Sequence, residues 1–214
     1  QIDYLSKYFT LIVWDMRGHG QTDYPDDENL YNEKETIEDI KEILNELKIE
    51  KANVGGMSLG GYMSLAFYCK YPEMVENLLI IDTGPGFKNF EARDSWNNYA
   101  LKQAKKFEDI GLDGLKGKSK EMNPENHRNA KGLVYAAKGM LTQKDDRIIN
   151  ELPNIKVPTL IIVGENDKPF LAAADYMEKK IKISKKIIIK DAGHAVNIDQ
   201  PSVFNDEVKK FLMS

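Results

Sequence analysis

Ser58 stands where a predicted strand gives way to a predicted helix, and a serine at such a turn can act as a nucleophile. Residues 52–55 before it form a short extended segment, and residues 61–70 after it favour a helix and contain no proline. A turn this sharp strains the backbone of its central residue and exposes the hydroxyl, while the helix N-terminus favours developing negative charge. Gly56 and Gly60, two positions either side, are expected to let the strand and the helix pass closely. The pattern is typical of nucleophilic catalysis.

Two side chains further along the chain can supply the rest of that chemistry. Asp167 follows an apolar run at 158–163, and His194 follows another predicted strand at 186–190. Functional groups collect at the carboxyl ends of parallel strands, so we expect both to lie near Ser58. A histidine can accept the serine proton and return it to a leaving group, and a carboxylate can hold the imidazole in the required tautomer.

The acid of this constellation has alternatives. Asp167 is favoured, but Glu165 lies two residues closer to the strand end, and Asp82 ends the strand before the helical region. The two remaining histidines fit the catalytic role less well. His19 lies in a glycine-rich loop, where we predict a structural or pocket-lining role, and His127 lies in a polar segment, where we predict that it is solvated.

Apolar runs and helical patterns alternate along most of the chain. Runs typical of buried strands are found at residues 9–14, 77–82, 158–163 and 186–190. Helical patterns cover residues 36–49, 61–70, 170–182 and 201–212. The alternation predicts an α/β fold with a mostly parallel sheet flanked by helices.

One segment interrupts this alternation. Between residues 87 and 157 the pattern is helical and polar, without an evident strand. We therefore predict a helical cap at 87–157, inserted into a core made of residues 1–86 and 158–214.

Composition excludes several classes of partner. The net charge of −4, with lysines and glutamates interspersed, argues against the basic face that nucleic acids require. No apolar run approaches the length needed to span a membrane. The single cysteine, Cys69, permits no intrachain disulfide and fits a reducing, cytoplasmic compartment. No metal or nucleotide signature is present, so we expect no metal and no cofactor. The sequence does not indicate an oligomeric state.

Four motifs together resemble the α/β-hydrolase superfamily, in its branch of small cytosolic esterases, enol-lactonases and carbon–carbon bond hydrolases with helical caps. They lie at residues 15–22, 56–61, 163–169 and 192–201. The resemblance implies a Ser58, His194 and Asp167 triad that hydrolyses a small carboxylic ester or lactone, with the backbone amide of Leu59 as an oxyanion donor. A serine at the nucleophile position argues against the dehalogenases and epoxide hydrolases of the superfamily, which place an aspartate there.

The resemblance also implies that segments are missing. Members carry a His-Gly loop that donates a second oxyanion amide, and this chain starts at Gln1, after the position of that loop. Their strand order places a further strand between the one at residues 9–14 and the one before Ser58. We expect an N-terminally truncated fragment that lacks its N-terminal strands and folds poorly by itself.

Substrate contacts and alternative functions complete these expectations. Met57 and Phe170 adjoin the proposed catalytic residues and are the favoured pocket residues, whereas Arg17 is expected to have a structural role. Carbon–carbon bond hydrolysis or a lyase-type reaction would use the same triad. A ligand receptor that keeps the triad without turnover is the alternative from a different class.

Overall fold

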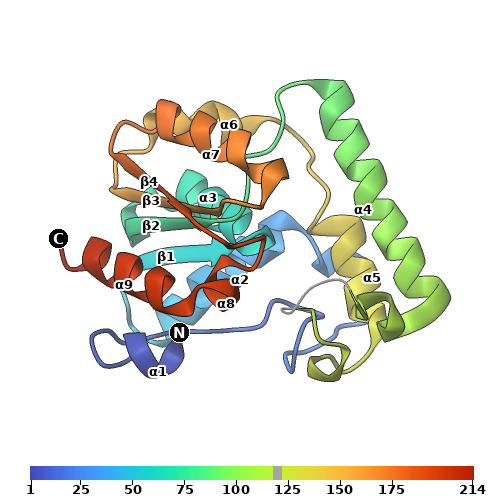
Figure 1. Cartoon of the computed structure of the whole chain (residues 1–214). Coiled ribbons are helices and arrows are strands. Elements are labelled where there is room, and N and C mark those ends of the chain that lie inside the picture. The colour runs from blue at the N-terminus through green and yellow to red at the C-terminus, as the bar shows by residue number, and fades with distance from the viewer. Residues whose placement is uncertain (118–121) are drawn as a thin grey trace. The chain divides into compact units, whose positions relative to one another are not determined.

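One four-stranded parallel sheet organises the computed structural model, which describes residues 1–117 and 122–214. The strands are β1 (Ala52–Met57), β2 (Val75–Ile81), β3 (Thr159–Gly164) and β4 (Ser184–Ile189). They lie side by side in the order β1-β2-β3-β4 (Figure 1). All three pairings are parallel, so the carboxyl ends of the strands share one edge of the sheet. The predicted α/β class is confirmed.

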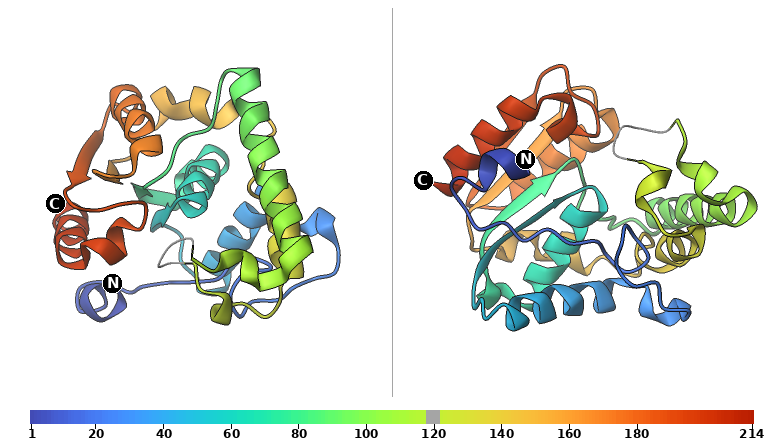
Figure 2. Two further views of the ribbon diagram at one scale, coloured as in Figure 1. Left: turned by 45° about the vertical axis from the view of Figure 1, so that its right-hand side comes forward. Right: turned by 90° about the horizontal axis from the view of Figure 1, so that it is seen from below.

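Helices cover both faces of this sheet (Figure 2). One face carries α3 (Leu59–Lys70) and α7 (Lys168–Lys180), and the other carries α1 (Ile2–Leu5), α8 (Val196–Asp199) and α9 (Pro201–Leu212). The remaining α-helices are α2 (Glu33–Glu46), α4 (Phe90–Ile110), α5 (Ala130–Gly139) and α6 (Arg147–Glu151). The predicted helices after Ser58, near 170–182 and from Pro201 onward are confirmed as α3, α7 and α9.

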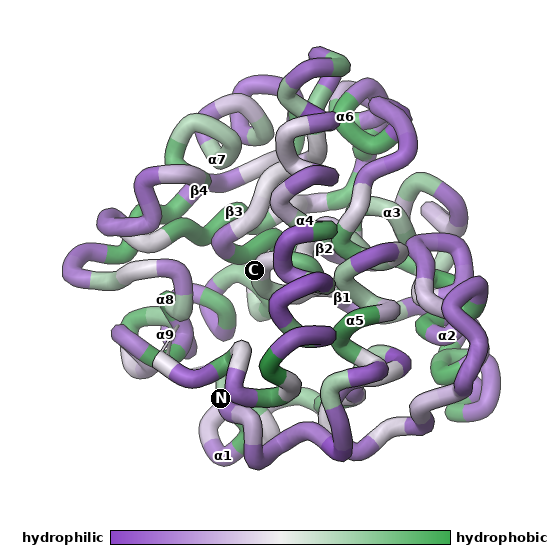
Figure 3. Tube along the Cα trace, turned by 90° about the vertical axis from the view of Figure 1, so that its right-hand side faces the viewer, coloured by the Kyte–Doolittle hydropathy of each residue, from purple (hydrophilic) through white to green (hydrophobic). Residues whose placement is uncertain are grey.

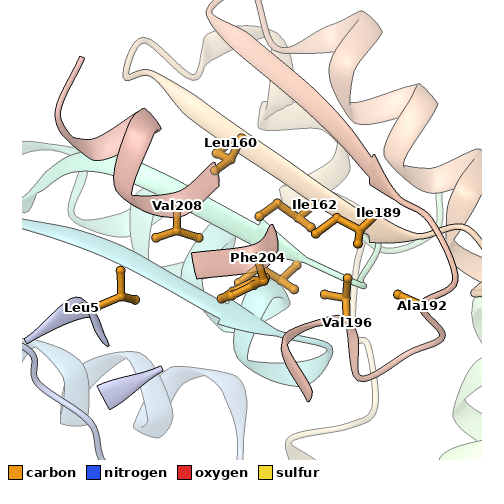
Figure 4. Packing of buried hydrophobic residues seen from close by; sticks show 9 residues of the cluster. Leu5, Leu160, Ile162, Ile189, Ala192, Val196, Phe204 and Val208 are labelled. Carbon is orange, nitrogen blue, oxygen red and sulfur yellow. The ribbon is translucent and has the colours of Figure 1, made fainter. Parts of the chain in front are cut away.

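One hydrophobic core, here called the α9 core, lies between β3 and the helix α9 (Figure 4). Leu160 and Ile162, two positions apart on β3, point to the same face because strand side chains alternate. There they meet Phe204 and Val208, which are one helical turn apart on α9, and Leu5 of α1. Burying each such side chain stabilises the fold by about 1.5–3 kcal/mol. This packing fixes β3 and α9, the elements that flank the segment with the candidate acid and histidine.

The chain divides into two compact units. One contains the whole sheet and comprises residues 1–13, 47–85 and 150–214, and the other comprises residues 14–46 and 86–149. The division expected from the sequence, a core and a cap at 87–157, remains a prediction. Residues 118–121 of that predicted cap lie outside the described residues.

The second unit is built on the packing of α4 against α5. Its core joins residues of both helices and of the turn after α4: Ala104, Phe107, Leu115, Leu133, Val134 and Ala137. Trp96 of α4 donates its indole N–H to the Leu141 carbonyl at 2.7 Å, which ties the helix to the segment after α5. Figure 3 shows α4 as largely hydrophilic, whereas β2 and β3 of the other unit are largely hydrophobic.

The predicted strand at residues 9–14 is wrong. This segment has no ladder partner, and β1 pairs only with β2 among the described residues. Its apolar, β-branched composition favours an extended backbone, but a strand also needs a neighbour for its hydrogen bonds. Phe9 and Leu11 pack against the α9 core, while Val13 is 70% exposed.

Membrane-spanning helices were not expected from the sequence. Within the described residues, every helix is too short or too polar to cross a bilayer.

Candidate active site

Ser58 occupies a strained turn between β1 and α3. Its φ of 53° and ψ of −118° lie in a region that residues other than glycine rarely adopt. Its N–H donates to the Ile81 carbonyl at 2.9 Å, and its own carbonyl accepts the N–H groups of Gly61 and Tyr62. The surrounding hydrogen bonds therefore hold the serine in a conformation that its own backbone disfavours.

Two glycines make this turn possible. A Cβ atom on Gly56 would lie 2.5 Å from the carbonyl carbon of Gly60, and one on Gly61 would lie 2.6 Å from the Cγ2 atom of Thr83. The expected need for Gly56 is confirmed. The expected need for Gly60 is wrong, because nothing lies within 4 Å of a Cβ placed there, and the second glycine that the close approach requires is Gly61.

Alanine substitutions at Gly56 and Gly60 should affect stability differently. Gly56→Ala forces a methyl group into backbone and should lower the free energy of unfolding by about 2–3 kcal/mol. Gly60→Ala, its matched control, should leave the free energy unchanged or raise it by up to about 1 kcal/mol, because alanine favours the helix. Urea unfolding of both variants measures this, and equal effects would contradict the packing described here.

The structure brings Asp167 and His194 together. Asp167 lies just before α7 and is buried, and its Oδ2 atom is 2.8 Å from Nδ1 of His194. The imidazole is about one third exposed, at 32%. Glu165, the nearer alternative, instead accepts the backbone N–H of Asp191 at 3.3 Å. Of the two carboxylates in this loop, Asp167 is therefore the one hydrogen-bonded to the imidazole.

The loops that carry these two residues lie side by side. Asn166 donates its N–H to the Ala192 carbonyl at 2.9 Å, and Asp199 accepts the N–H of Gly193 at 2.9 Å. A Cβ on Gly164 would lie 2.2 Å from the Gly193 carbonyl oxygen. Sequence reasoning missed the close approach at Gly164, for which a glycine at the very end of β3 is the available signal.

Asp82, the other alternative acid, lies at the end of β2 and contacts both loops. Its Oδ1 atom accepts the Gly164 N–H at 2.8 Å and its Oδ2 atom accepts the Val196 N–H at 3.3 Å. Burial is the main cause that raises the pKa of Asp82 to about 7. The charge of Asp167 raises this pKa too, whereas the two N–H groups and His194 lower it.

This raised pKa predicts that stability depends on pH. In the unfolded chain Asp82 ionises near its ordinary pKa of 3.8, whereas the folded protein keeps its proton up to about pH 7. Between these two pKa values the folded state binds more protons than the unfolded state. The free energy of unfolding therefore falls as the pH rises through this range. A pKa difference of about three units is worth on the order of 4 kcal/mol.

Urea unfolding of the wild type and of Asp82→Asn, between about pH 4 and pH 8, measures this contribution. The free energy of unfolding of the wild type, minus that of the variant, should decrease as the pH rises. A difference that stays constant over the range would show that Asp82 has an ordinary pKa.

The remaining predicted site residues are placed as follows. The Phe170 ring stacks on the imidazole of His194, with centroids 5.2 Å apart and planes at 24°. Met57, the last residue of β1, is partly buried against the α9 core. Leu59 is the first residue of α3, where backbone N–H groups have no acceptor within the helix. Phe170 is therefore the predicted pocket residue that contacts the proposed base.

The glycine-rich loop of the second unit contains structural contacts. Arg17 binds Asp39 through two nitrogens, at 2.8 and 2.6 Å, so its predicted structural role is confirmed. His127, for which we predict solvation, is partly exposed, and its Nδ1 atom accepts the Gly20 N–H at 3.2 Å while its ring lies edge-on to His19. These partners are more than a hundred residues apart in the chain, and local patterns carry no signal for them.

Metal-ligating side chains do not cluster in the part of the chain that the structure describes. No group of three or more histidine, cysteine, aspartate or glutamate residues there could hold a metal ion.

Comparisons with known proteins agree with this architecture. A family model described as alpha/beta hydrolase fold matches residues 1–111. A Bacillus subtilis protein, provisionally named 2-succinyl-6-hydroxy-2,4-cyclohexadiene-1-carboxylate synthase, is 31% identical over 229 residues, covering 95% of this chain and 81% of the relative. The 3-oxoadipate enol-lactonase 1 of Acinetobacter baylyi is 27% identical over 231 residues, covering 100% and 82% of the two chains. The crystal structure of the enol-lactonase from Burkholderia xenovorans superposes with a TM-score of 0.80 at 24% identity, covering 100% of this chain and 85% of that one.

Proposed function

Because the chain belongs to the α/β-hydrolase fold family, we propose that this enzyme cleaves a small carboxylic ester or lactone through a serine-bound acyl intermediate. The observation that carries the proposal is the 2.8 Å hydrogen bond between Asp167 and His194, in the loops that follow adjacent strands. The strained backbone of Ser58, at the same edge of the sheet, supports it.

The proposed roles follow from the chemistry of each group. The Oγ atom of Ser58 attacks the carbonyl carbon while its proton passes to Nε2 of His194. Asp167 holds Nδ1 and stabilises the imidazolium that forms. The imidazolium then returns the proton to the leaving oxygen, and the C–O bond breaks. Water, deprotonated by the same histidine, attacks the acyl group and releases the acid and the serine.

The N-terminus of α3 supports stabilisation of the tetrahedral intermediate. The Leu59 N–H lies directly after the nucleophile, at a helix end that favours negative charge. We assign it as one oxyanion donor. Met57 and Phe170, which adjoin Ser58 and Asp167, are assigned to the substrate pocket.

A second candidate reaction has one observation in its favour. The Bacillus subtilis relative at 31% identity is named a synthase rather than a hydrolase. A lyase-type reaction or hydrolysis of a carbon–carbon bond, with Ser58 acting mainly as a base, is therefore the alternative within the same proposed site.

Substrate profiling distinguishes these functions. The wild-type chain is incubated with aryl esters of short acids, with an enol-lactone and with a dienoic diketone. A separate assay measures formation of 2-succinyl-6-hydroxy-2,4-cyclohexadiene-1-carboxylate, the product in the name of the Bacillus subtilis relative. Rapid release of phenol or opening of the lactone would support the proposal. Turnover confined to the diketone or the synthase reaction would support the alternative. Saturable ligand binding with a thermal shift and no product would indicate a receptor.

The proposed domain division and cellular location are those expected from the sequence. We propose a core of residues 1–86 and 158–214 with a helical cap at 87–157, acting on a small molecule in the cytoplasm. The chain has a single cysteine, Cys69, and so permits no intrachain disulfide, in keeping with a reducing compartment.

A further inference from the structure

Asp82 occupies the centre of the sheet edge that carries the proposed triad. Met57 pairs with Ile81, the last residues of β1 and β2. Ser58 and Asp82 therefore directly follow two neighbouring strands. The strand order places β2 between the strand of Ser58 and the strand that precedes Asp167. Asp82 has a φ of 44° and is 1% exposed, so its placement carries a backbone and a desolvation penalty.

The carboxylate of Asp82 uses one oxygen for each catalytic loop. Oδ1 accepts the N–H of Gly164, three residues before Asp167, and Oδ2 accepts the N–H of Val196, two residues after His194. One rigid group therefore sets the separation of the two backbones that carry the acid and the base.

The chemistry of this bridge selects a carboxylate. An ionised carboxylate accepts hydrogen bonds on both oxygens, whereas the amide of asparagine has one acceptor and would place an NH₂ group against the second N–H. A buried carboxylate is costly unless its bonds are needed, and this one lies close enough to Asp167 and His194 for their charges to act on it.

We propose that Asp82 is a positioning residue, which clamps the loops of Asp167 and His194 so that their hydrogen bond forms in the geometry needed for proton transfer. The proposal rests on the catalytic roles proposed for those two residues. Asp82 does not itself replace Asp167, because the Nδ1 partner of the imidazole is Asp167.

Asp82→Asn tests the clamp at about pH 8, where the wild-type carboxylate is ionised. With histidines labelled by ¹⁵N, the far-downfield Nδ1 proton of His194 should weaken through faster solvent exchange. Where Asp82 is ionised in the wild type, the apparent pKa of His194 should be lower in the variant, because a nearby negative charge is lost. The rate of labelling by a fluorophosphonate should fall roughly tenfold to a hundredfold as the histidine is misplaced.

Two further variants separate the clamp from general destabilisation. Thr159→Val removes a buried hydroxyl at the opposite end of β3 and should leave the His194 signals unchanged. Val196→Pro, at the first position of α8, removes one donated N–H without changing charge. It should lower the labelling rate with little change in the pKa of His194, and it remains informative where Asp82→Asn does not fold.

The outcomes are distinct. Loss of the Nδ1 signal and of the labelling rate in Asp82→Asn, with both retained in Thr159→Val, would support the clamp. A folded Asp82→Asn with wild-type Nδ1 signal, pKa and labelling rate would overturn it. If the wild type itself is not labelled, the proposed hydrolase function fails, while the Nδ1 signal still decides whether Asp82 positions His194.

Discussion

Ser58→Ala is expected to lower the turnover of an activated aryl ester by about 10⁶-fold. Without the hydroxyl no acyl intermediate forms, and the histidine has no nucleophile to deprotonate. Alanine keeps a similar backbone cost at the φ of 53°, so the free energy of unfolding should stay close to that of the wild type. Initial rates of the purified variant, with its thermal melt recorded alongside, measure both effects.

Ser64→Ala is the matched control for this loss. Ser64 lies in the same helix α3 and donates its buried hydroxyl to the Gly60 carbonyl at 2.8 Å. Its removal should change stability slightly and turnover little. Retention of ester turnover by Ser58→Ala, or an equal loss in both variants, would remove Ser58 from the nucleophile role.

Asp167→Asn is expected to lower kcat by about 10⁴-fold while KM changes little. The asparagine side chain preserves the shape of the site, but its amide can donate to Nδ1 and so favour the wrong imidazole tautomer. It also removes the charge that stabilises the imidazolium. Steady-state kinetics on the ester that the wild type turns over fastest measure the change.

Glu165→Gln is the matched control, because it removes a carboxylate two residues away in the same loop. Glu165 accepts the Asp191 N–H, so its loss should affect the loop without altering the imidazole tautomer. A greater loss in Glu165→Gln than in Asp167→Asn would assign the acid to Glu165. Near-normal turnover in Asp167→Asn, with turnover abolished in Asp82→Asn, would assign it to Asp82.

The sheet and its main helices could be predicted from the sequence because their signals are local. Parallel strands buried on both faces read as short apolar runs, and β2, β3 and β4 lie at three such runs. The segment at residues 9–14 has the same composition and forms no strand. Pairing depends on a neighbouring strand, and composition records only the preference for an extended backbone.

The hydrogen-bonded pair of the candidate site could also be predicted, because Asp167 and His194 each follow shortly after the end of a predicted strand. The bond between Asp167 and His194 joins loops that follow adjacent strands, so topology brings them together. The two loops held by Asp82 could not be predicted, because its partners lie 82 and 114 residues away. The need for Gly61 rather than Gly60 depends on which way each Cα–H points in α3, which spacing alone does not give.

The central claim is that Ser58 is an activated nucleophile, and intact-mass analysis after treatment with a fluorophosphonate tests it most directly. The probe forms a P–O bond to an activated serine and loses fluoride, so each labelled chain gains one defined mass. We predict one adduct on the wild type, none on Ser58→Ala, and wild-type labelling of Ser64→Ala. An unlabelled wild type, or an adduct that persists in Ser58→Ala, would contradict the account.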